Sequence, residues 1–169
     1  STQSGCRMGC HFCATGRYGF HGNLTAGDIV NQVTSVTEAA KVNHVVFMGM
    51  GEPMDNYDNV MKACDILTAE WGLSVSSANI TVSTVGLQPA TGLFIEKSKC
   101  NLALSLFSPF PEERKAFVAA EMISPASEII GIMKSFPARR KRRFSIAYVM
   151  MEGINDSEKH LEELKTILD

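Results

Sequence analysis

The chain has 169 residues, of which 45% are hydrophobic, and its formal net charge at pH 7 is -2. These values suit one globular domain with a real core and exclude a disordered or low-complexity chain, and a pI of about 6.1 does not indicate a basic nucleic-acid-binding domain. The apolar runs fall far short of the roughly 20 residues that cross a bilayer, and no signal peptide is recognisable, so we expect a cytoplasmic protein without a membrane partner.

Near the start of the chain, three cysteines have the spacing Cys-x-x-x-Cys-x-x-Cys, at Cys6, Cys10 and Cys13. Three thiolates bind one metal centre and leave a position open, which is typical of an iron-sulfur cluster that binds a substrate or cofactor directly. Thiolates also suit zinc, and His11 or His21 can complete a Cys3His site, so a structural zinc site is the alternative. Because five cysteines is an odd number, we expect reduced thiols and no disulfide framework.

The segment after the cysteines begins an alternation of helices and strands. A helix is predicted over residues 25–42, because Thr25 and Asp28 form a capping box and apolar residues follow at helical spacing. Residues 44–48 are rich in β-branched and aromatic side chains and end before a glycine, which is typical of a buried parallel strand.

The same alternation continues to the end of the chain. In chain order we predict a helix carrying Val60, Cys64, Leu67 and Trp71; a strand over 80–84; a helix over 87–97; a strand over 101–106; helices over 112–120 and 127–136; a strand over 144–151; and a helix carrying Leu161, Leu164, Ile167 and Leu168. Four βα units in series predict the α/β class, with a parallel sheet, outer helices and the winding of a partial (βα) barrel. The sheet is expected to be cut at both ends.

Functional residues in such folds gather at the carboxyl ends of the strands. The segments at these ends are 49–53, 83–86, 105–108 and 152–155. The basic run over 139–143 enters its strand at the opposite end, and we interpret it as a solvated loop.

The three cysteines with Phe12 between the last two, followed one strand later by Gly51-Glu52-Pro53, resemble the radical S-adenosylmethionine (SAM) superfamily. Further segments resemble the bacterial RNA methyltransferases of the RlmN/Cfr family, which act on carbon 2 of adenine. These segments are 16–20, 23–25, 48–53, 82–84, 105–106, 111–114, 148–150 and 153–156. The resemblance implies a single radical-SAM core domain over 1–169, with the N-terminal and C-terminal parts of the full protein missing.

The resemblance also assigns roles to residues. It implies that Cys6, Cys10 and Cys13 hold a 4Fe-4S cluster whose open iron is chelated by the methionine part of SAM. Gly51 and Glu52 would receive the ammonium group of SAM, for which a carboxylate is a natural acceptor. The other expected cofactor-binding residues are Phe12 near the adenine, and Ser83, Ser105, Leu106 and Phe107 near the ribose and carboxylate.

By the same resemblance, the enzyme methylates an adenosine of ribosomal RNA, with transfer RNA as a further substrate, and takes electrons from a protein such as a flavodoxin. The bound cofactor would supply a 5'-deoxyadenosyl radical. Two family cysteines carry out the methyl transfer, one upstream of the cluster loop and one near the C-terminus. This chain reaches neither, so we expect no catalytic residue within it and no RNA methylation by it alone. Cys64 and Cys100 are interpreted as buried packing residues.

The sequence departs from the family pattern at two places. Phe107 stands where a histidine is expected after Ser-Leu, and Val118-Ala119 stands where Met-Pro is expected. Loss of an imidazole removes a hydrogen-bonding group, which bears on the substrate more than on the cofactor. Two alternatives therefore stay open: a divergent radical-SAM enzyme with a different substrate, and a zinc-stabilised RNA-binding module.

Overall fold

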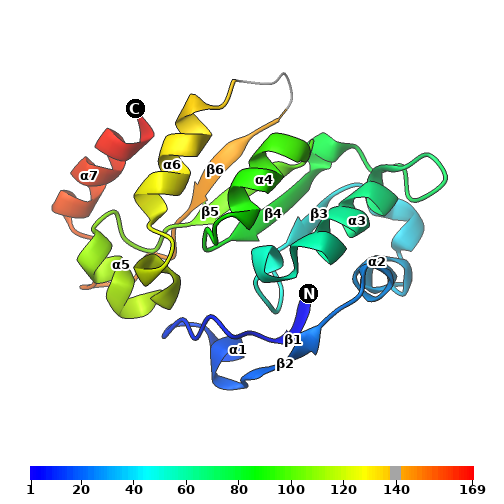
Figure 1. Ribbon diagram of the computed structural model, residues 1–169, viewed down its shortest axis with the longest axis horizontal. Coiled ribbons are helices and arrows are strands. Elements are labelled where there is room, and N and C mark those ends of the chain that lie inside the picture. Colours follow the sequence, from blue (N-terminus) through cyan, green and yellow to red (C-terminus); the bar gives the residue numbers. More distant parts are fainter. Residues whose placement is uncertain (138–141) are drawn as a thin grey trace.

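The centre of the fold is a parallel sheet of four strands, seen in a computed structural model that describes residues 1–137 and 142–169 (Figure 1). The strands are β3 (Val45–Phe47), β4 (Ile80–Thr84), β5 (Asn101–Ser105) and β6 (Phe144–Ala147), in the spatial order β3-β4-β5-β6. Val82 pairs with Phe47 on one side and with Leu102 on the other. Consecutive parallel neighbours require a crossover between each pair of strands, so the predicted α/β class and partial (βα) barrel winding are confirmed.

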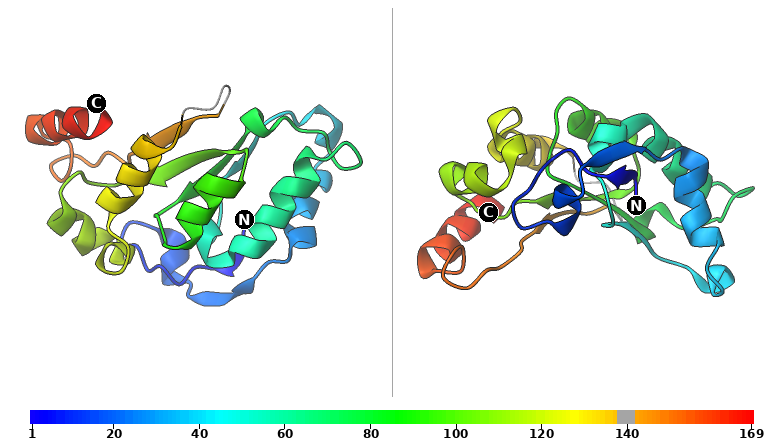
Figure 2. Two further views of the ribbon diagram at one scale, coloured as in Figure 1. Left: turned by 45° about the horizontal axis from the view of Figure 1, so that its top comes forward. Right: turned by 90° about the horizontal axis from the view of Figure 1, so that it is seen from below.

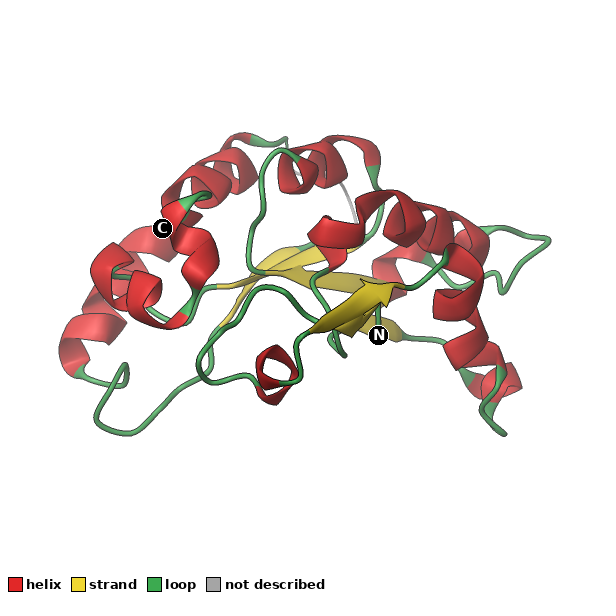
Figure 3. Ribbon diagram, turned by 60° about the horizontal axis from the view of Figure 1, so that its bottom comes forward, coloured by secondary structure: helices red, strands yellow, loops and turns green. Residues whose placement is uncertain are grey.

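Helices α3, α4 and α6 cover one face of this sheet (Figures 1 and 3). The longer helices are α2 (Ala26–Thr34), α3 (Tyr57–Thr68), α4 (Ala90–Lys97), α5 (Pro111–Phe117), α6 (Ala126–Ser135) and α7 (Glu158–Leu168). The core lies between helices and sheet, and its fully buried side chains include Val60, Leu67, Ile80, Phe94 and Leu102. Cys64 and Cys100 belong to the same buried core, as predicted.

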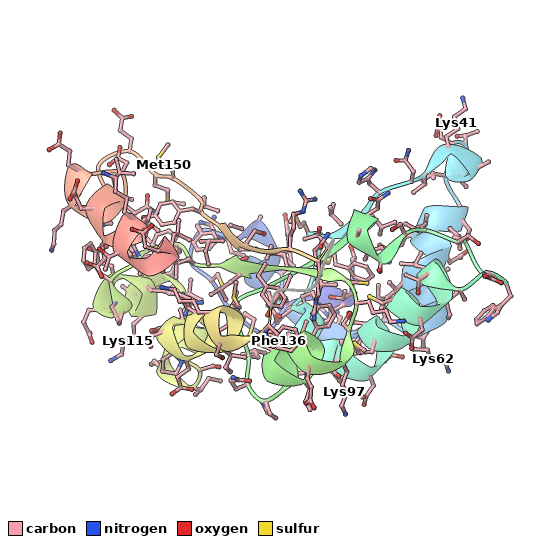
Figure 4. The ribbon with its side chains drawn as sticks, turned by 90° about the horizontal axis from the view of Figure 1, so that it is seen from above. Lys41, Lys62, Lys97, Lys115, Phe136 and Met150 are labelled. Carbon is pink, nitrogen blue, oxygen red and sulfur yellow. The ribbon has the colours of Figure 1, made fainter. Side chains whose placement is uncertain are left out.

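Among the residues that the structure describes, no second layer of helices covers the opposite face of the sheet (Figure 4). In Figure 4, Lys62 and Lys97 lie on the outer side of the helical layer. Met150 and Lys41 lie on the other side of the sheet, at opposite ends of the molecule. Strand side chains alternate between the two faces. The face without helices therefore carries the small side chains of Thr81 and Ser83, which are only partly buried.

The N-terminal segment forms an antiparallel pair of strands that the sequence analysis did not predict. β1 (Gln3–Gly5) pairs with β2 (Phe20–Asn23), and the cysteine loop with the short helix α1 (Ala14–Arg17) lies between them. Figure 2 shows this segment crossing the edge of the sheet, between α5 and α2. Gly5 has a φ of +80°, and a Cβ there would lie 1.9 Å from the carbonyl oxygen of Gly19. Only glycine permits this close approach, which closes the loop at its base.

Several predicted boundaries were wrong. The helix expected over 25–42 ends at Thr34, where the side chains of Thr34 and Ser35 donate to Oδ1 of Asn31. Such local side-chain bonds compete with helix continuation. α3 ends before Trp71, which is 79% exposed. The strand expected over 144–151 ends at Ala147, since its partner β5 ends at Ser105. The helix expected over 112–120 ends at 117, and a separate 3-10 turn follows over Ala119–Met122.

Part of the predicted basic run can be located. Arg139, Arg140 and Lys141 lie outside the described residues. Arg142 is not a solvated side chain: its Nε donates to the carbonyl oxygen of Cys100 at 2.8 Å and its Nη1 to that of Ile95 at 2.6 Å. A cation that binds the last carbonyls of a helix stabilises that helix end, so Arg142 stabilises the C-terminal end of α4. Within residues 1–137 and 142–169, no helix is long and apolar enough to cross a membrane.

The capping box at the start of α2 is confirmed. Oγ1 of Thr25 accepts from the Asp28 amide at 3.1 Å, and the Asp28 carboxylate accepts from the Thr25 amide at 3.0 Å. We expect Thr25→Ala to lower the free energy of unfolding by about 1 kcal/mol, measured by urea denaturation. Thr37→Ala, at an exposed position outside the helix, is the control. An equal loss in both variants would argue against the cap.

Candidate functional site

The three cysteines of the N-terminal loop lie near one another. Cys10 is buried, and the Cys13 amide donates to the Cys10 carbonyl at 3.0 Å, which turns the loop just before α1. Burial, followed by the nearby thiolates of Cys6 and Cys13, raises the pKa of Cys10 to about 11. Because the two neighbours act on Cys10 through their charge, the three sulfur atoms lie within electrostatic reach of each other.

Three thiols that leave one position open are the donor set of an iron-sulfur cluster, and the two histidines that could complete a zinc site make other contacts. Among the residues that the structure describes, no three His, Cys, Asp or Glu side chains are placed to hold one metal ion. Zinc needs all its thiolates about 2.3 Å from one centre, whereas the thiolates of a 4Fe-4S cluster each bind a different iron and lie farther apart. The two histidines are directed elsewhere: the ring of His11 packs edge-on against Phe117, and Nε2 of His21 lies 2.9 Å from the Tyr18 carbonyl oxygen.

Glu52 lies at the carboxyl ends of β3 and β4 with only 4% of its surface exposed. Its carboxylate accepts hydrogen bonds from the Thr84 hydroxyl at 2.5 Å, the Val85 amide at 3.0 Å and the Met54 amide at 3.0 Å. Burial is the largest influence and raises the pKa of Glu52, although these three donors lower it. The carboxylate charge also contributes to the raised pKa of Cys10, so it lies near the cysteine loop. The site therefore combines a buried carboxyl group with three thiols.

Gln3 of β1 connects the backbone of Glu52, through Asp55 and Arg7, to the cysteine loop. Its Oε1 accepts from the Glu52 amide at 2.9 Å, and its Nε2 donates to Asp55 at 2.7 Å. Nε of Arg7, inside the cysteine loop, lies 2.8 Å from the same Asp55 carboxylate. Gly51 has a φ of +95°, and a Cβ there would lie 2.6 Å from Cβ of Gln3. Glycine is therefore required at position 51 for β1 to pack against the loop.

The predicted serines meet at the neighbouring strand ends, but Leu106 does not join them. Oγ of Ser83 lies 3.1 Å from Oγ of Ser105. The Leu106 side chain is buried in a cluster with Ala126 and Ile129 of α6. Its amide and carbonyl are both engaged, the amide with β6 and the carbonyl with Arg114. The structure thus brings Ser83 and Ser105 together and directs the side chain of Leu106 into the core.

Phe12 and Phe107 lie against each other beside the cysteines. Their rings stack with centroids 5.1 Å apart and planes 4° apart, and Phe107 stacks in turn on Phe117. Cys10 and Cys13 pack against this apolar cluster. Phe107 therefore gives the cysteine loop an apolar wall at the position where the resemblance expects an imidazole.

Two buried polar residues of the site, Arg114 and Asn155, have no predicted role. Arg114 is 1% exposed; it pairs with Glu121 and donates to the carbonyl oxygens of Val85 and Leu106 at the ends of β4 and β5. Asn155 is also 1% exposed and binds the backbone around the end of β6. Both lie in segments that carry the family resemblance, and Asn155 also lies in the segment 152–155 expected at a strand end. For Arg114 the resemblance was the only signal.

Comparison with known proteins places this site in a family. The family model described as the radical SAM superfamily matches residues 1–164. A protein of Parabacteroides distasonis named "Probable dual-specificity RNA methyltransferase RlmN" is 45% identical over 168 residues, which are 99% of this chain and 49% of the relative. The "Dual-specificity RNA methyltransferase RlmN" of Syntrophotalea carbinolica is 39% identical over 99% of this chain and 45% of its own length.

A solved structure agrees. The crystal structure of a radical SAM methyltransferase from Sphaerobacter thermophilus superposes with a TM-score of 0.90 at 38% identity, over 99% of this chain and 51% of that chain. The chain thus spans about half the length of the relatives it matches. Because the family model covers nearly all of its residues, and the thiols and the buried carboxylate meet at the carboxyl ends of the strands, this chain belongs to the radical SAM superfamily.

Proposed function

We propose that residues 1–169 are the cofactor-binding core domain of an enzyme that methylates carbon 2 of an adenosine in RNA. The observation that carries the proposal is the convergence of the cysteine loop and the buried Glu52 at one edge of the sheet, in a chain 45% identical to a protein named as an RlmN methyltransferase. The methyl-carrying cysteine would come from the half of such an enzyme that lies beyond this chain. Ribosomal RNA would be the substrate, transfer RNA a second one, and a flavodoxin-type protein in the cytoplasm the electron donor.

We propose separate roles for the residues of the site. Cys6, Cys10 and Cys13 would hold a 4Fe-4S cluster, and Gly51 and Glu52 would receive the ammonium group of SAM. When bound, the cluster and SAM supply the radical chemistry. The remaining cofactor contacts would come from the ring of Phe12, the hydroxyls of Ser83 and Ser105, and Phe107, with Leu106 supporting this segment from the core.

A second candidate is a radical-SAM enzyme with another substrate. It is favoured by the stack of Phe107 against Phe12, because a wall of phenylalanine rings offers no hydrogen bond where an imidazole would. This candidate shares the cluster and the SAM site with the first and differs only in what is modified.

Anaerobic reconstitution with iron and sulfide tests the proposal. We expect about four irons per chain, a brown colour, and reductive cleavage of SAM to methionine and 5'-deoxyadenosine with dithionite. One zinc and no iron would overturn the proposal. The full-length enzyme, incubated with ribosomal RNA and analysed by mass spectrometry, should form 2-methyladenosine; cleavage of SAM without this product would favour the second candidate.

The raised pKa of Glu52 leads to a pH-dependent prediction. Its protonated form is favoured in the fold, so its contribution to stability is greatest below the ordinary pKa of 4.5 and falls as the pH rises through the raised value. An ammonium group beside the carboxylate lowers that pKa. We therefore expect SAM binding to the reconstituted protein to release protons at pH values between the lowered and the raised pKa of Glu52, and none well above the raised value, measured by calorimetry in two buffers with different heats of ionisation.

Glu52→Gln removes this ionisation. The variant should release fewer protons on binding and bind SAM about ten- to a hundredfold more weakly, because a hydrogen bond to a charged group is lost. Glu112→Gln, on an exposed turn of α5, is the matched control and should behave as the original protein does. An unchanged proton release in Glu52→Gln would contradict the role of this carboxylate.

A further inference from the structure

Three phenylalanine rings from separate parts of the chain form one continuous stack beside the cysteines. Phe12 comes from the cysteine loop, Phe107 follows β5, and Phe117 ends α5. The Phe12 and Phe107 centroids are 5.1 Å apart, and those of Phe107 and Phe117 are 4.5 Å apart with planes 28° apart. Aromatic pairs at such distances stabilise each other beyond the apolar area they bury. The stack therefore links the cysteine loop to the segment after β5 and to the end of α5.

The middle ring is held in an unusual backbone conformation. Phe107 has a φ of +68°, which bulky residues rarely adopt, and only 2% of its surface is exposed. Such a conformation persists only where the surroundings enforce it. Nδ2 of Asn155 donates to the Phe107 carbonyl at 2.6 Å and to the Val149 carbonyl at 2.8 Å, while its Oδ1 accepts from the Met151 amide at 2.7 Å. Asn155 thus ties Phe107 to the segment between β6 and α7.

The backbone of the cysteine loop is attached to the same stack. The His11 amide donates to the Phe117 carbonyl at 3.0 Å, and the His11 ring packs edge-on against the Phe117 ring. Residues 6–13 contain no helix or strand of their own, since α1 begins only at Ala14. The shape of this loop therefore depends on outside contacts, and the stack supplies several of them.

We infer that Phe107 and Phe117 are positioning residues that fix the loop carrying Cys10 and Cys13, and that Asn155 holds Phe107 in place for this purpose. The segment between β6 and α7 then sets the geometry in which the cysteines are presented to the metal centre. The inference rests on the proposed cluster-binding function but concerns the shape of the loop before any cluster is bound.

Three leucine variants and one tyrosine variant test this inference. Phe107→Leu and Phe117→Leu keep apolar volume but remove the stack, and Phe136→Leu is the control because Phe136 pairs with Phe144 elsewhere in the fold. Phe117→Tyr restores a stacking ring at a partly buried position. In the iron-free, reduced chain we expect the His11 amide to exchange with solvent about tenfold faster in both stack variants. In Phe136→Leu and Phe117→Tyr, exchange should stay near the original rate.

A second readout follows the metal. At limiting iron, Phe107→Leu and Phe117→Leu should retain less iron than Phe136→Leu, and the electron paramagnetic resonance lines of the reduced cluster should broaden. Should Phe107→Leu fail to fold, Phe117→Leu alone decides, because this ring is only partly buried. Unchanged His11 exchange and unchanged spectra in the stack variants would overturn the inference. Failure of the original protein to bind iron would instead overturn the proposed function and leave the exchange test valid.

Discussion

Replacing Cys10 by alanine is expected to abolish cluster binding and all reductive cleavage of SAM. Cys10 is the most buried of the three thiols, and the charges of Cys6 and Cys13 both act on it. With two thiolates left, only two of the three irons that need a cysteine ligand would have one, and the fourth iron is the one expected to bind SAM. Iron should fall from about four per chain to near zero, measured by metal analysis together with visible absorption after anaerobic reconstitution.

The matched control is Cys64→Ala. Cys64 is also buried, but it lies in α3 within the core between helices and sheet, so its loss should weaken packing and leave the iron content unchanged. Full iron binding by Cys10→Ala would remove the basis of the proposed cluster site. Equal loss in both variants would indicate that any buried thiol is needed for folding, and not that Cys10 is a ligand.

The strands and the edge of the sheet that carries the site follow from local sequence. Residues 80–84 are mostly β-branched (Ile-Thr-Val-Ser-Thr), and residues 101–105 carry a short apolar stretch, Leu-Ala-Leu, between Asn101 and Ser105; both patterns favour short buried strands. Parallel strands that end at one edge bring their next residues together, and so Ser83 and Ser105 lie 3.1 Å apart although 22 residues separate them. This part of the site could be predicted because it depends only on where each strand ends.

The remaining structure depends on contacts between distant segments. β1 and β2 are three and four residues long and contain Gly5 and Gly22, with no β-branched residue, so no local signal marks them as strands. They exist because Gln3 packs against Gly51 and binds the Glu52 amide. Phe107 likewise has no local signal for a left-handed backbone, since Asn155, 48 residues later, holds it there.

Arg114→Met is expected to lower the free energy of unfolding by about 3–5 kcal/mol, because it leaves a buried carboxylate without its partner. The Arg114 guanidinium pairs with the buried Glu121 carboxylate. It also donates to the Val85 carbonyl at 2.6 Å and to the Leu106 carbonyl at 2.9 Å. Removing it takes a donor away from both carbonyls and leaves the Leu106 carbonyl with the Ser108 amide at 2.9 Å. Urea denaturation of the reduced chain measures the loss.

Two further variants test whether the loss of stability comes from the burial of the Arg114–Glu121 ion pair and not from the loss of any charge. Arg7→Met breaks the pair with Asp55, but the Arg7 side chain is 51% exposed, so the expected loss is about 1 kcal/mol or less. The double variant Arg114→Met/Glu121→Leu removes both buried charges and should recover part of the stability, although the Ala126 amide then loses its acceptor. Equal losses in Arg7→Met and Arg114→Met, with no recovery in the double variant, would mean that Arg114 stabilises the strand ends by packing alone.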